Sequence, residues 1–171
     1  MLNKSKKKLI IFMPSIEGGG VEQNLFMICN YLILRMKSVQ VLTANEKDKK
    51  YFNKKISFLS PKGYFWQNKG RALKTFICMY LLLRERLKEK NLVVFSFQAN
   101  IATIIFCKLF GLKVIARSNA APSGWSKNFK KKKIFKLILP LADEVIVNSF
   151  QFKRDLDLSF RTNSKCIYNP L

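Results

Sequence analysis

The sequence predicts an α/β fold built on a doubly wound parallel sheet, and three observations support this. Short apolar segments of strand length alternate with longer segments whose apolar residues recur every three or four positions. Three consecutive glycines, at 18–20, join the first strand-like segment to the first helix-like one. Segment 92–97 is a continuous β-branched and aromatic run, typical of a parallel strand covered on both faces. Such sheets bind ligands beyond the carboxyl ends of their strands, where the strand order reverses.

In the first half of the chain, a strand is predicted over 8–13. A helix follows over 21–32, with apolar residues at 21, 25, 28 and 32 on one face. A second strand over 38–43 leads through a polar, lysine-rich loop (45–55) to a short third strand over 56–59. Segment 61–68 is predicted to be a loop with exposed aromatic residues. A long helix is predicted over 71–90, apolar through Phe76, Ile77, Tyr80, Leu81 and Leu83.

The second half continues the alternation. After the strand over 92–97, a helix is predicted over 100–110, with Gly111 as its C′ residue, and then a strand over 113–117. A loop (118–128) precedes a helix over 129–139, which Pro140 kinks or ends. A strand over 143–148 is followed by a short helix to about Leu158, which Ser149 is expected to cap, and by a last strand over 164–168.

Length and composition indicate one folded domain. The chain has 171 residues, 49% of them hydrophobic, and its formal net charge is +22, mostly from lysine. An anionic partner, either nucleic acid or a membrane surface, would account for this charge. A/T-rich codon usage is an alternative, because Asn, Ile and Phe are abundant too. The excess of Lys over Arg favours codon bias together with a membrane-facing surface over nucleic acid, because phosphate readers favour the bidentate fork of Arg.

The cysteines and the N-terminus limit the other classes. The four cysteines are far apart and the chain has no histidine, so no metal site is predicted. Cys29, Cys78 and Cys107 lie in apolar helical segments and are expected to be buried thiols of a reducing compartment. The apolar stretch after the basic N-terminus is too short for a signal peptide, and no segment reaches the length of a membrane-spanning helix. We therefore expect a cytoplasmic location, with peripheral association at the inner face of the plasma membrane as an option.

The glycine loop does not match the two best-known phosphate-binding loops. The dinucleotide fingerprint G-x-G-x-x-G fails because Gln23 stands at its third glycine, and no G-K-[ST] follows the glycines as a Walker loop requires. The loop would still offer backbone N–H groups at a helix N-terminus to an anion. A plain strand-to-helix turn is the alternative.

Four motifs together resemble glycosyltransferase family 4, whose members have the GT-B fold. Gly18-Gly19-Gly20-Val21-Glu22 resembles the G-G-x-E loop near the start of these enzymes. Segment 114–119 resembles their strand ending in Arg-x-Asn, and segment 142–149 resembles their A-D-x-[IV]-[IV]-x-x-S run. Segment 166–171 resembles the I-x-N-[PG]-[VI] run that enters the interdomain linker. The resemblance spans essentially all of residues 1–171 and implies one N-terminal, acceptor-side Rossmann-like domain, the N-terminal half of a GT-B enzyme.

The resemblance implies transfer of a sugar from a nucleotide sugar to a glycan or lipid-linked acceptor, in bacterial cell-surface polysaccharide or lipopolysaccharide synthesis. In the family, the C-terminal domain holds the nucleotide and carries the E-x7-E element, which these residues lack. The nucleotide-sugar donor is therefore expected only with that missing or separate domain, and no other cofactor is expected. Several members carry a histidine near the sugar; this chain has none, so no catalytic residue is assigned. The alternatives are a non-catalytic Rossmann-like module or truncated gene product and, with no reader motif to support it, a nucleic-acid binder.

The candidate residues of a donor-diphosphate and acceptor cleft follow the strands: Gly18, Gly19, Gly20, Glu22, Gln98, Asn100, Arg117, Asn119 and Ser149. Glu22 is expected to complement the helix dipole rather than to catalyse. Arg117 is expected either to bind an acceptor phosphate, to approach the donor cleft or to form a salt bridge. Gln98 and Asn100 are expected to recognise acceptor hydroxyls, or Asn100 to cap a helix, and Ser149 is expected to be a cap.

A lysine cluster beside aromatic residues is the candidate membrane-facing surface: Trp125, Lys130, Lys131, Lys132 and Lys133. Basic side chains beside aromatic and aliphatic ones suit an anionic leaflet. A solvated helix face is the alternative.

Overall fold

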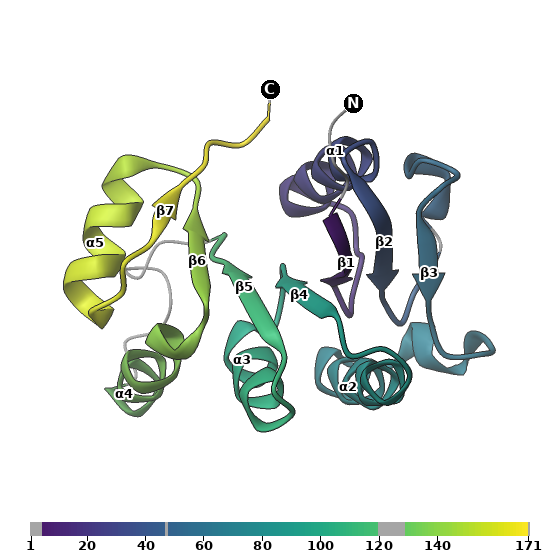
Figure 1. The fold of residues 1–171 in the computed structure, drawn as a ribbon. Coiled ribbons are helices and arrows are strands. Elements are labelled where there is room, and N and C mark those ends of the chain that lie inside the picture. Colours follow the sequence, from purple (N-terminus) through teal and green to yellow (C-terminus); the bar gives the residue numbers. More distant parts are fainter. Residues whose placement is uncertain (1–4, 47, 120–128, 171) are drawn as a thin grey trace.

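The computed structural model describes residues 5–46, 48–119 and 129–170, which form one seven-stranded parallel sheet (Figure 1). The strands are β1 (Ser5–Phe12), β2 (Met36–Leu42), β3 (Ser57–Leu59), β4 (Leu92–Ser96), β5 (Lys113–Arg117), β6 (Glu144–Val147) and β7 (Lys165–Cys166). Their order is β3-β2-β1-β4-β5-β6-β7, and each neighbouring pair is parallel. The predicted doubly wound α/β fold is confirmed.

The strand order reverses between β1 and β4. Ile10 of β1 lies between Gln40 of β2 and Val94 of β4, so the chain winds outward from β1 in both directions. At such a switch point, the connections that leave the two central strands diverge and open a crevice at the carboxyl edge. The glycine loop follows β1 and Gln98 follows β4, so two predicted site segments meet at this point.

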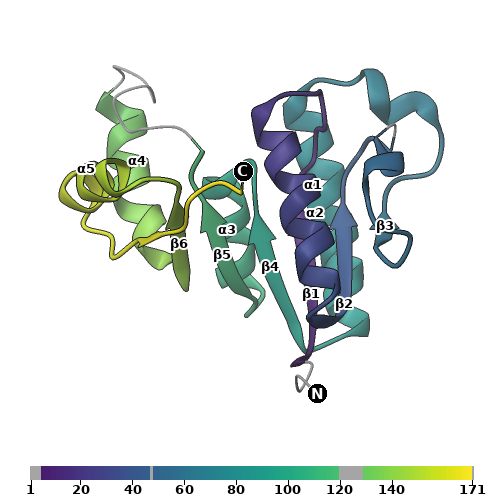
Figure 2. The same cartoon turned by 90° about the horizontal axis from the view of Figure 1, so that it is seen from above.

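Helices cover the two faces of the sheet unequally. The helices are α1 (Gly20–Ile33), α2 (Arg71–Lys88), α3 (Asn100–Leu109), α4 (Phe129–Ile138) and α5 (Phe150–Phe160), with short 3-10 turns η1 (Lys49–Tyr51), η2 (Tyr64–Asn68) and η4 (Leu139–Leu141). In Figure 1, α2, α3 and α4 lie beneath the sheet, α1 lies above β1 and β2, and α5 lies beside β6 and β7. Figure 2, seen from above, shows α1 over β1 and β2 but no described helix over β4 and β5.

The alternation of side chains along β1 separates two cores. Ile10 and Phe12 point to the larger core, which contains residues of α2, α3 and α5. Leu9 and Ile11 point to the smaller core beneath α1. Both faces of the second half of β1, Leu9–Phe12, are therefore buried, which is why this part of the strand is continuously apolar.

Strand β4 is covered completely on one face and only partly on the other, where Phe95 is buried and Val93 is half-buried. Val94 lies in the larger core, but Val93 and Phe95 line a groove on the opposite face. Helix α1 is displaced toward β1 and β2, so its deepest residues are Leu25, Cys29 and Ile33 rather than the predicted set at 21, 25, 28 and 32. The flank carrying Ile28 and Leu32 borders the groove instead.

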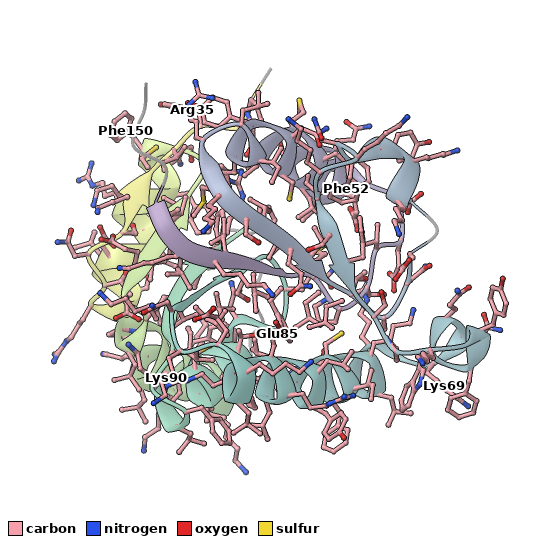
Figure 3. All side chains as sticks on the ribbon, turned by 45° about the vertical axis from the view of Figure 1, so that its right-hand side comes forward. Arg35, Phe52, Lys69, Glu85, Lys90 and Phe150 are labelled. Carbon is pink, nitrogen blue, oxygen red and sulfur yellow. The ribbon has the colours of Figure 1, made fainter. Side chains whose placement is uncertain are left out.

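The face of the long helix α2 that packs against the core does not contain all of its most apolar residues. Cys78 and Leu82 are fully buried, whereas Phe76 and Tyr80 are 70% and 52% exposed. Figure 3 shows α2 extending between the labelled Lys69 and Lys90. The helix ends at Lys88, two residues before the predicted end. In the preceding segment, Tyr64 and Phe65 are exposed as predicted, but Trp66 packs against the larger core.

Short-range polar contacts fix the chain around α5. The Ser149 hydroxyl accepts a hydrogen bond from the Phe152 N–H at 3.1 Å, so the predicted cap is confirmed. The helix continues to Phe160, two residues beyond the predicted end. The Asp157 carboxylate then accepts from the Thr162 hydroxyl and the Ser164 N–H, which turns the chain into β7.

The cysteines and the helices bear on the chain's environment. Cys29, Cys78 and Cys107 are buried free thiols, as predicted. Within residues 5–46, 48–119 and 129–170, no helix has the length and apolar character needed to cross a membrane.

Candidate functional site at the carboxyl edge of the sheet

The glycine loop turns the chain from β1 into α1 and leaves backbone donors open. Gly18 has φ +82°, a left-handed conformation that favours glycine, and Gly19 is the extended N-cap of α1. No side chain caps the helix. In the described part of the chain, no protein oxygen accepts a hydrogen bond from the Gly18, Gly19 or Gly20 N–H. The loop can therefore donate N–H groups to a ligand at the positive end of the helix dipole.

Glu22 supports this loop from beneath. It is 7% exposed, and its Oε1 accepts a hydrogen bond from the Glu17 N–H at 3.4 Å. A Cβ on Gly19 would lie 3.1 Å from the other Glu22 carboxylate oxygen, whereas a Cβ on Gly18 or Gly20 would meet nothing within 4 Å. Glu22 thus lies in the first turn of α1, and the space outside Gly20 is open.

Four polar residues that the sequence analysis missed lie next to the loop. Arg71 Nη2 donates to Glu17 Oε2 at 2.6 Å, and the Ser15 hydroxyl donates to Glu17 Oε1 at 2.6 Å. Lys74 Nζ donates to Ser15 Oγ at 3.2 Å from a position only 6% exposed. The hydrogen bonds from Arg71, and then from Ser15, lower the pKa of Glu17 to about 2. The two cations come from the first turns of α2, a segment that sequence periodicity assigns only to a helix.

Gln98 connects the glycine segment to a pocket beyond β4 and β5. Its Oε1 accepts a hydrogen bond from the Ser15 N–H at 3.1 Å. Gln98 also lines a pocket of about 700 Å³ together with three other predicted site residues, Asn100, Arg117 and Asn119. The structure therefore brings these four residues together, and Gln98 ties them to the loop after β1.

Arg117 is a buried cation held by neutral partners. It is 3% exposed, and it donates from Nε to Asn119 Oδ1 at 3.1 Å and from Nη2 to Asn169 Oδ1 at 2.6 Å. Its guanidinium carbon lies 5.5 Å from the centre of the Phe97 ring, within cation–π range. Burial lowers the pKa of this guanidinium. The salt-bridge alternative is wrong within the described residues, because Arg117 has no carboxylate partner there.

Asn100 and Asn119 hold the two strand ends in place. Asn100 is the first residue of α3, and its side chain accepts from the Ser96 hydroxyl and donates to the Arg117 carbonyl, both at 2.8 Å. The capping alternative for Asn100 is wrong, because the N-cap is Ala99, with φ 54° and no side-chain cap. Asn119 Nδ2 donates to the Phe97 carbonyl at 3.0 Å. These bonds join β4 to β5 at the carboxyl edge of the sheet.

The remaining predicted residues lie elsewhere. Ser149 caps α5 and does not line the pocket beyond β4 and β5. Lys130, Lys131, Lys132 and Lys133 are exposed on α4, and Lys131 also borders that pocket with Ile134 and Phe135. Trp125 lies outside the described residues.

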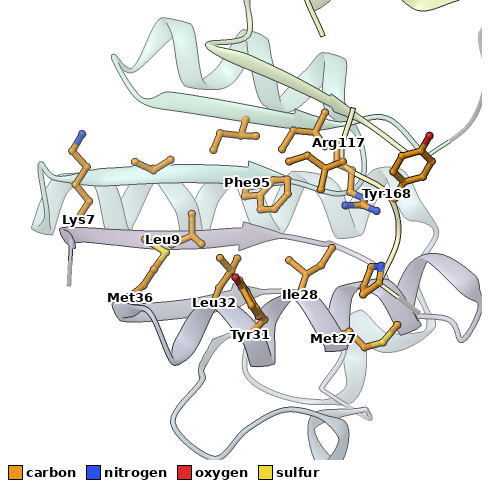
Figure 4. A pocket seen from close by; sticks show the side chains of 15 residues that line it. Lys7, Leu9, Met27, Ile28, Tyr31, Leu32, Met36, Phe95, Arg117 and Tyr168 are labelled. Carbon is orange, nitrogen blue, oxygen red and sulfur yellow. The ribbon is translucent and has the colours of Figure 1, made fainter. Parts of the chain in front are cut away.

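An apolar groove occupies the uncovered face of the sheet (Figure 4). It has a volume of about 790 Å³ and is lined by Leu9, Ile28, Leu32, Val93, Phe95, Ile115 and Ile146, among others. In Figure 4, Lys7 lies at one end and Arg117 and Tyr168 lie at the other. Arg117 lines both this groove and the pocket beyond β4 and β5.

Metal and thiol chemistry depend on the geometry and burial of the side chains in the described part of the chain. No three His, Cys, Asp or Glu residues cluster there as metal ligands would. Burial raises the pKa of Cys78 and Cys107 to about 12 and raises that of Cys29 as well, so these thiols are poor nucleophiles at neutral pH. The described groups at this edge are N–H donors, amides, hydroxyls, cations and the carboxylates of Glu17 and Glu22.

Comparison of structures shows where this fold recurs. Anabaena Alr3699/HepE in complex with UDP superposes with a TM-score of 0.66 at 13% identity, covering 96% of this chain and 44% of that one. A ugt transferase from Siraitia grosvenorii in complex with UDP gives 0.57 at 14% identity, covering 95% and 50%. MurG from Acinetobacter baumannii gives 0.53 at 15% identity, covering 94% and 45%. These proteins are GT-B glycosyltransferases, so the chain has the α/β fold of a GT-B domain.

The chain spans about half, or less, of the length of these solved structures. No protein-family model and no curated protein matches the sequence.

Proposed function

We propose that this chain is the acceptor-side, N-terminal half of a family 4 GT-B glycosyltransferase. The whole enzyme moves a sugar from a nucleotide sugar to a glycan or lipid-linked acceptor in bacterial cell-surface polysaccharide or lipopolysaccharide synthesis. The observation that carries the proposal is the switch point between β1 and β4. There, the glycine loop before the uncapped α1 and a pocket lined in part by three amide side chains and the buried Arg117 share one edge, on a fold that recurs in glycosyltransferases.

The chemistry of sugar transfer fits this edge. A departing diphosphate gains negative charge, and preorganised N–H donors lower the energy of that charge. The open N–H groups of Gly18, Gly19 and Gly20 would serve this purpose. In the neighbouring pocket, Gln98 and Asn119 would orient acceptor hydroxyls, and Arg117 would attract an acceptor phosphate. A donor-binding half would supply the nucleotide site, and two of the structural relatives were solved in complex with UDP.

Nucleotide-sugar affinity tests this proposal. Residues 1–171 alone are expected to bind UDP- and GDP-sugars only in the millimolar range, because most donor contacts would come from the other half. Joining the chain to the donor half of a GT-B enzyme should produce measurable binding by calorimetry and sugar transfer. Sub-micromolar binding to residues 1–171 alone would instead indicate a self-contained nucleotide-binding protein.

We also propose that the exposed lysines of α4 attach the enzyme to an anionic membrane. Lys130, Lys131, Lys132 and Lys133 are all exposed, and Ile134 is 48% exposed beside them. Each lysine near an anionic surface contributes about 1 kcal/mol of attraction. The chain should therefore sediment with vesicles rich in phosphatidylglycerol, less so as salt rises.

Changing Lys130–Lys133 together to Gln should weaken this sedimentation at least about tenfold. The matched control is the same change at Lys49, Lys50, Lys54 and Lys55, four exposed lysines outside α4. Equal losses of vesicle sedimentation in the two variants would show that only net charge matters. That result would contradict a membrane-binding surface on α4. Tighter binding to RNA than to vesicles would favour a nucleic-acid partner.

A further inference from the structure

The most buried lysine of the described chain has no carboxylate partner. Lys74 is 6% exposed, and no carboxylate oxygen of a described residue lies within 4.0 Å of its ammonium. Its one hydrogen bond goes to the neutral Ser15 hydroxyl, at 3.2 Å. By contrast, the ammonium of Lys8, which is also partly buried, lies 2.6 Å from Glu85. A buried ammonium is costly unless an anion compensates it.

The helix that carries Lys74 adds to this excess of positive potential. Arg71 and Lys74 lie in the first turns of α2, where the dipole is positive, and that first turn has no acidic residue and no side-chain cap. Cations are unfavourable at a helix N-terminus, so their position there calls for an anion. The N-terminus of α1 is also without a side-chain cap, and it follows the glycine loop at 18–20.

Glu17 provides that anion from an exposed position. Its carboxylate is bound by Arg71 at 2.6 Å and by the Ser15 hydroxyl at 2.6 Å, and Ser15 in turn receives the hydrogen bond from Lys74. The Glu17 and Arg71 side chains are 43% and 76% exposed, so this ion pair can open without moving the core. The second carboxylate nearby, that of Glu22, is turned under Gly19 and accepts from the Glu17 N–H.

We propose that Glu17 occupies an anion site formed by Arg71, Ser15 and Lys74, and that a phosphate group of a ligand displaces its carboxylate. A phosphate offers the same acceptor oxygens with more charge, and it would take over the hydrogen bonds from Arg71 and Ser15. Lys74 strengthens the site from beneath, and Glu17 weakens it as an internal competitor. The proposal rests on the proposed function, in which the phosphate belongs to the diphosphate of the sugar donor.

Two substitutions with opposite expected effects test the site. Titration of the ¹⁵N-labelled chain with inorganic pyrophosphate should shift the amide signals of Gly18–Gly20. Lys74→Met should lower the pyrophosphate affinity about tenfold, and Glu17→Gln should raise it about fivefold, because the competitor loses its charge. Glu17→Gln leaves Lys74 in place, so it tests the site even if Lys74→Met fails to fold.

The matched controls make the same charge changes at the opposite edge of the sheet. Lys165 and Glu144 form an exposed ion pair at the amino ends of β7 and β6. Lys165→Met and Glu144→Gln should change the affinity less than about twofold. Unchanged affinity in both test variants would overturn the site and leave Lys74 as a support of Ser15. Equal changes of pyrophosphate affinity in the two control variants would overturn the anion site as well.

UDP and glucose 1-phosphate, as further probes, separate this proposal from the proposed function. In the chain joined to a donor half, UDP binding that depends on Lys74 and Glu17 supports both. If substitution of Lys74 and of Glu17 leaves the UDP affinity unchanged, the anion site is overturned and the proposed function stands. Pyrophosphate binding that depends on both residues, without any UDP binding, supports the site and counts against the proposed function. A stronger dependence on Lys74 for glucose 1-phosphate than for UDP would overturn the donor assignment.

Discussion

Replacing Gly20 with valine is expected to lower sugar transfer about 100-fold in a protein that joins residues 1–171 to a GT-B donor half. Gly20 is the first residue of α1, and a Cβ there would meet no protein atom within 4 Å. The added side chain would therefore enter the space proposed for the donor diphosphate and leave the fold intact. Initial rates of transfer from a radiolabelled nucleotide sugar measure the loss.

Size and stability controls make this result specific. Gly20→Ala adds only one methyl group and should cost less activity than Gly20→Val. The free energy of unfolding of each variant should stay within about 0.5 kcal/mol of the parent. Gly19 is a poorer choice, because a Cβ there would lie 3.1 Å from Glu22. Full activity of Gly20→Val would show that the glycine loop is only a turn.

Replacing Leu82 with alanine is expected to lower the free energy of unfolding by about 2–5 kcal/mol, because it removes buried methyl groups and leaves a cavity. Leu82 is fully buried where α2 packs on the sheet, in the core that also contains Ile10 and Val94. Urea unfolding followed by far-UV circular dichroism measures the change.

Leu87 is the matched control in the same helix. It is 79% exposed, so Leu87→Ala should change the free energy of unfolding by less than about 0.5 kcal/mol. Equal losses in the two variants would mean that α2 packs through a different face from the one observed. The pair therefore tests the helix orientation that also places Lys74 beside Ser15.

The predicted site residues divide according to how local their partners are. Ser149 caps its own helix three residues away, a contact that local sequence rules describe well. Arg117 and Asn100 each have one local partner, Asn119 and Ser96, and one distant partner: Arg117 binds Asn169, and Asn100 binds the Arg117 carbonyl. The salt-bridge alternative for Arg117 considered only its charge, and the capping alternative for Asn100 considered only its position in the sequence. Both were wrong for that reason.

Lys74 shows a related limit. Its sequence context is a helix whose neighbouring residues Phe76 and Tyr80 are more apolar, yet those two are exposed and Lys74 is buried. The rotation of a helix about its axis depends on the surface it packs against, and the apolar residues of α2 are too widely distributed to fix that rotation. The sequence did contain one signal of an anion nearby. Arg71 and Lys74 are two cations in the first turns of a helix, a position that is unfavourable for cations without an anion.

The sequence by itself determined the alternating strands and helices, the parallel sheet and the position of the glycine loop, because these follow from local periodicity and from the short reach of a glycine turn. Only the tertiary structure decided that α1 lies toward β1 and β2, so that β4 and β5 keep one face open as an apolar groove. It alone also brought Glu17, Arg71 and Lys74 to one place, since residues 54 positions apart meet only when α2 packs beneath the sheet. Such contacts between distant residues depend on how the whole chain packs, so no short segment of the sequence encodes them.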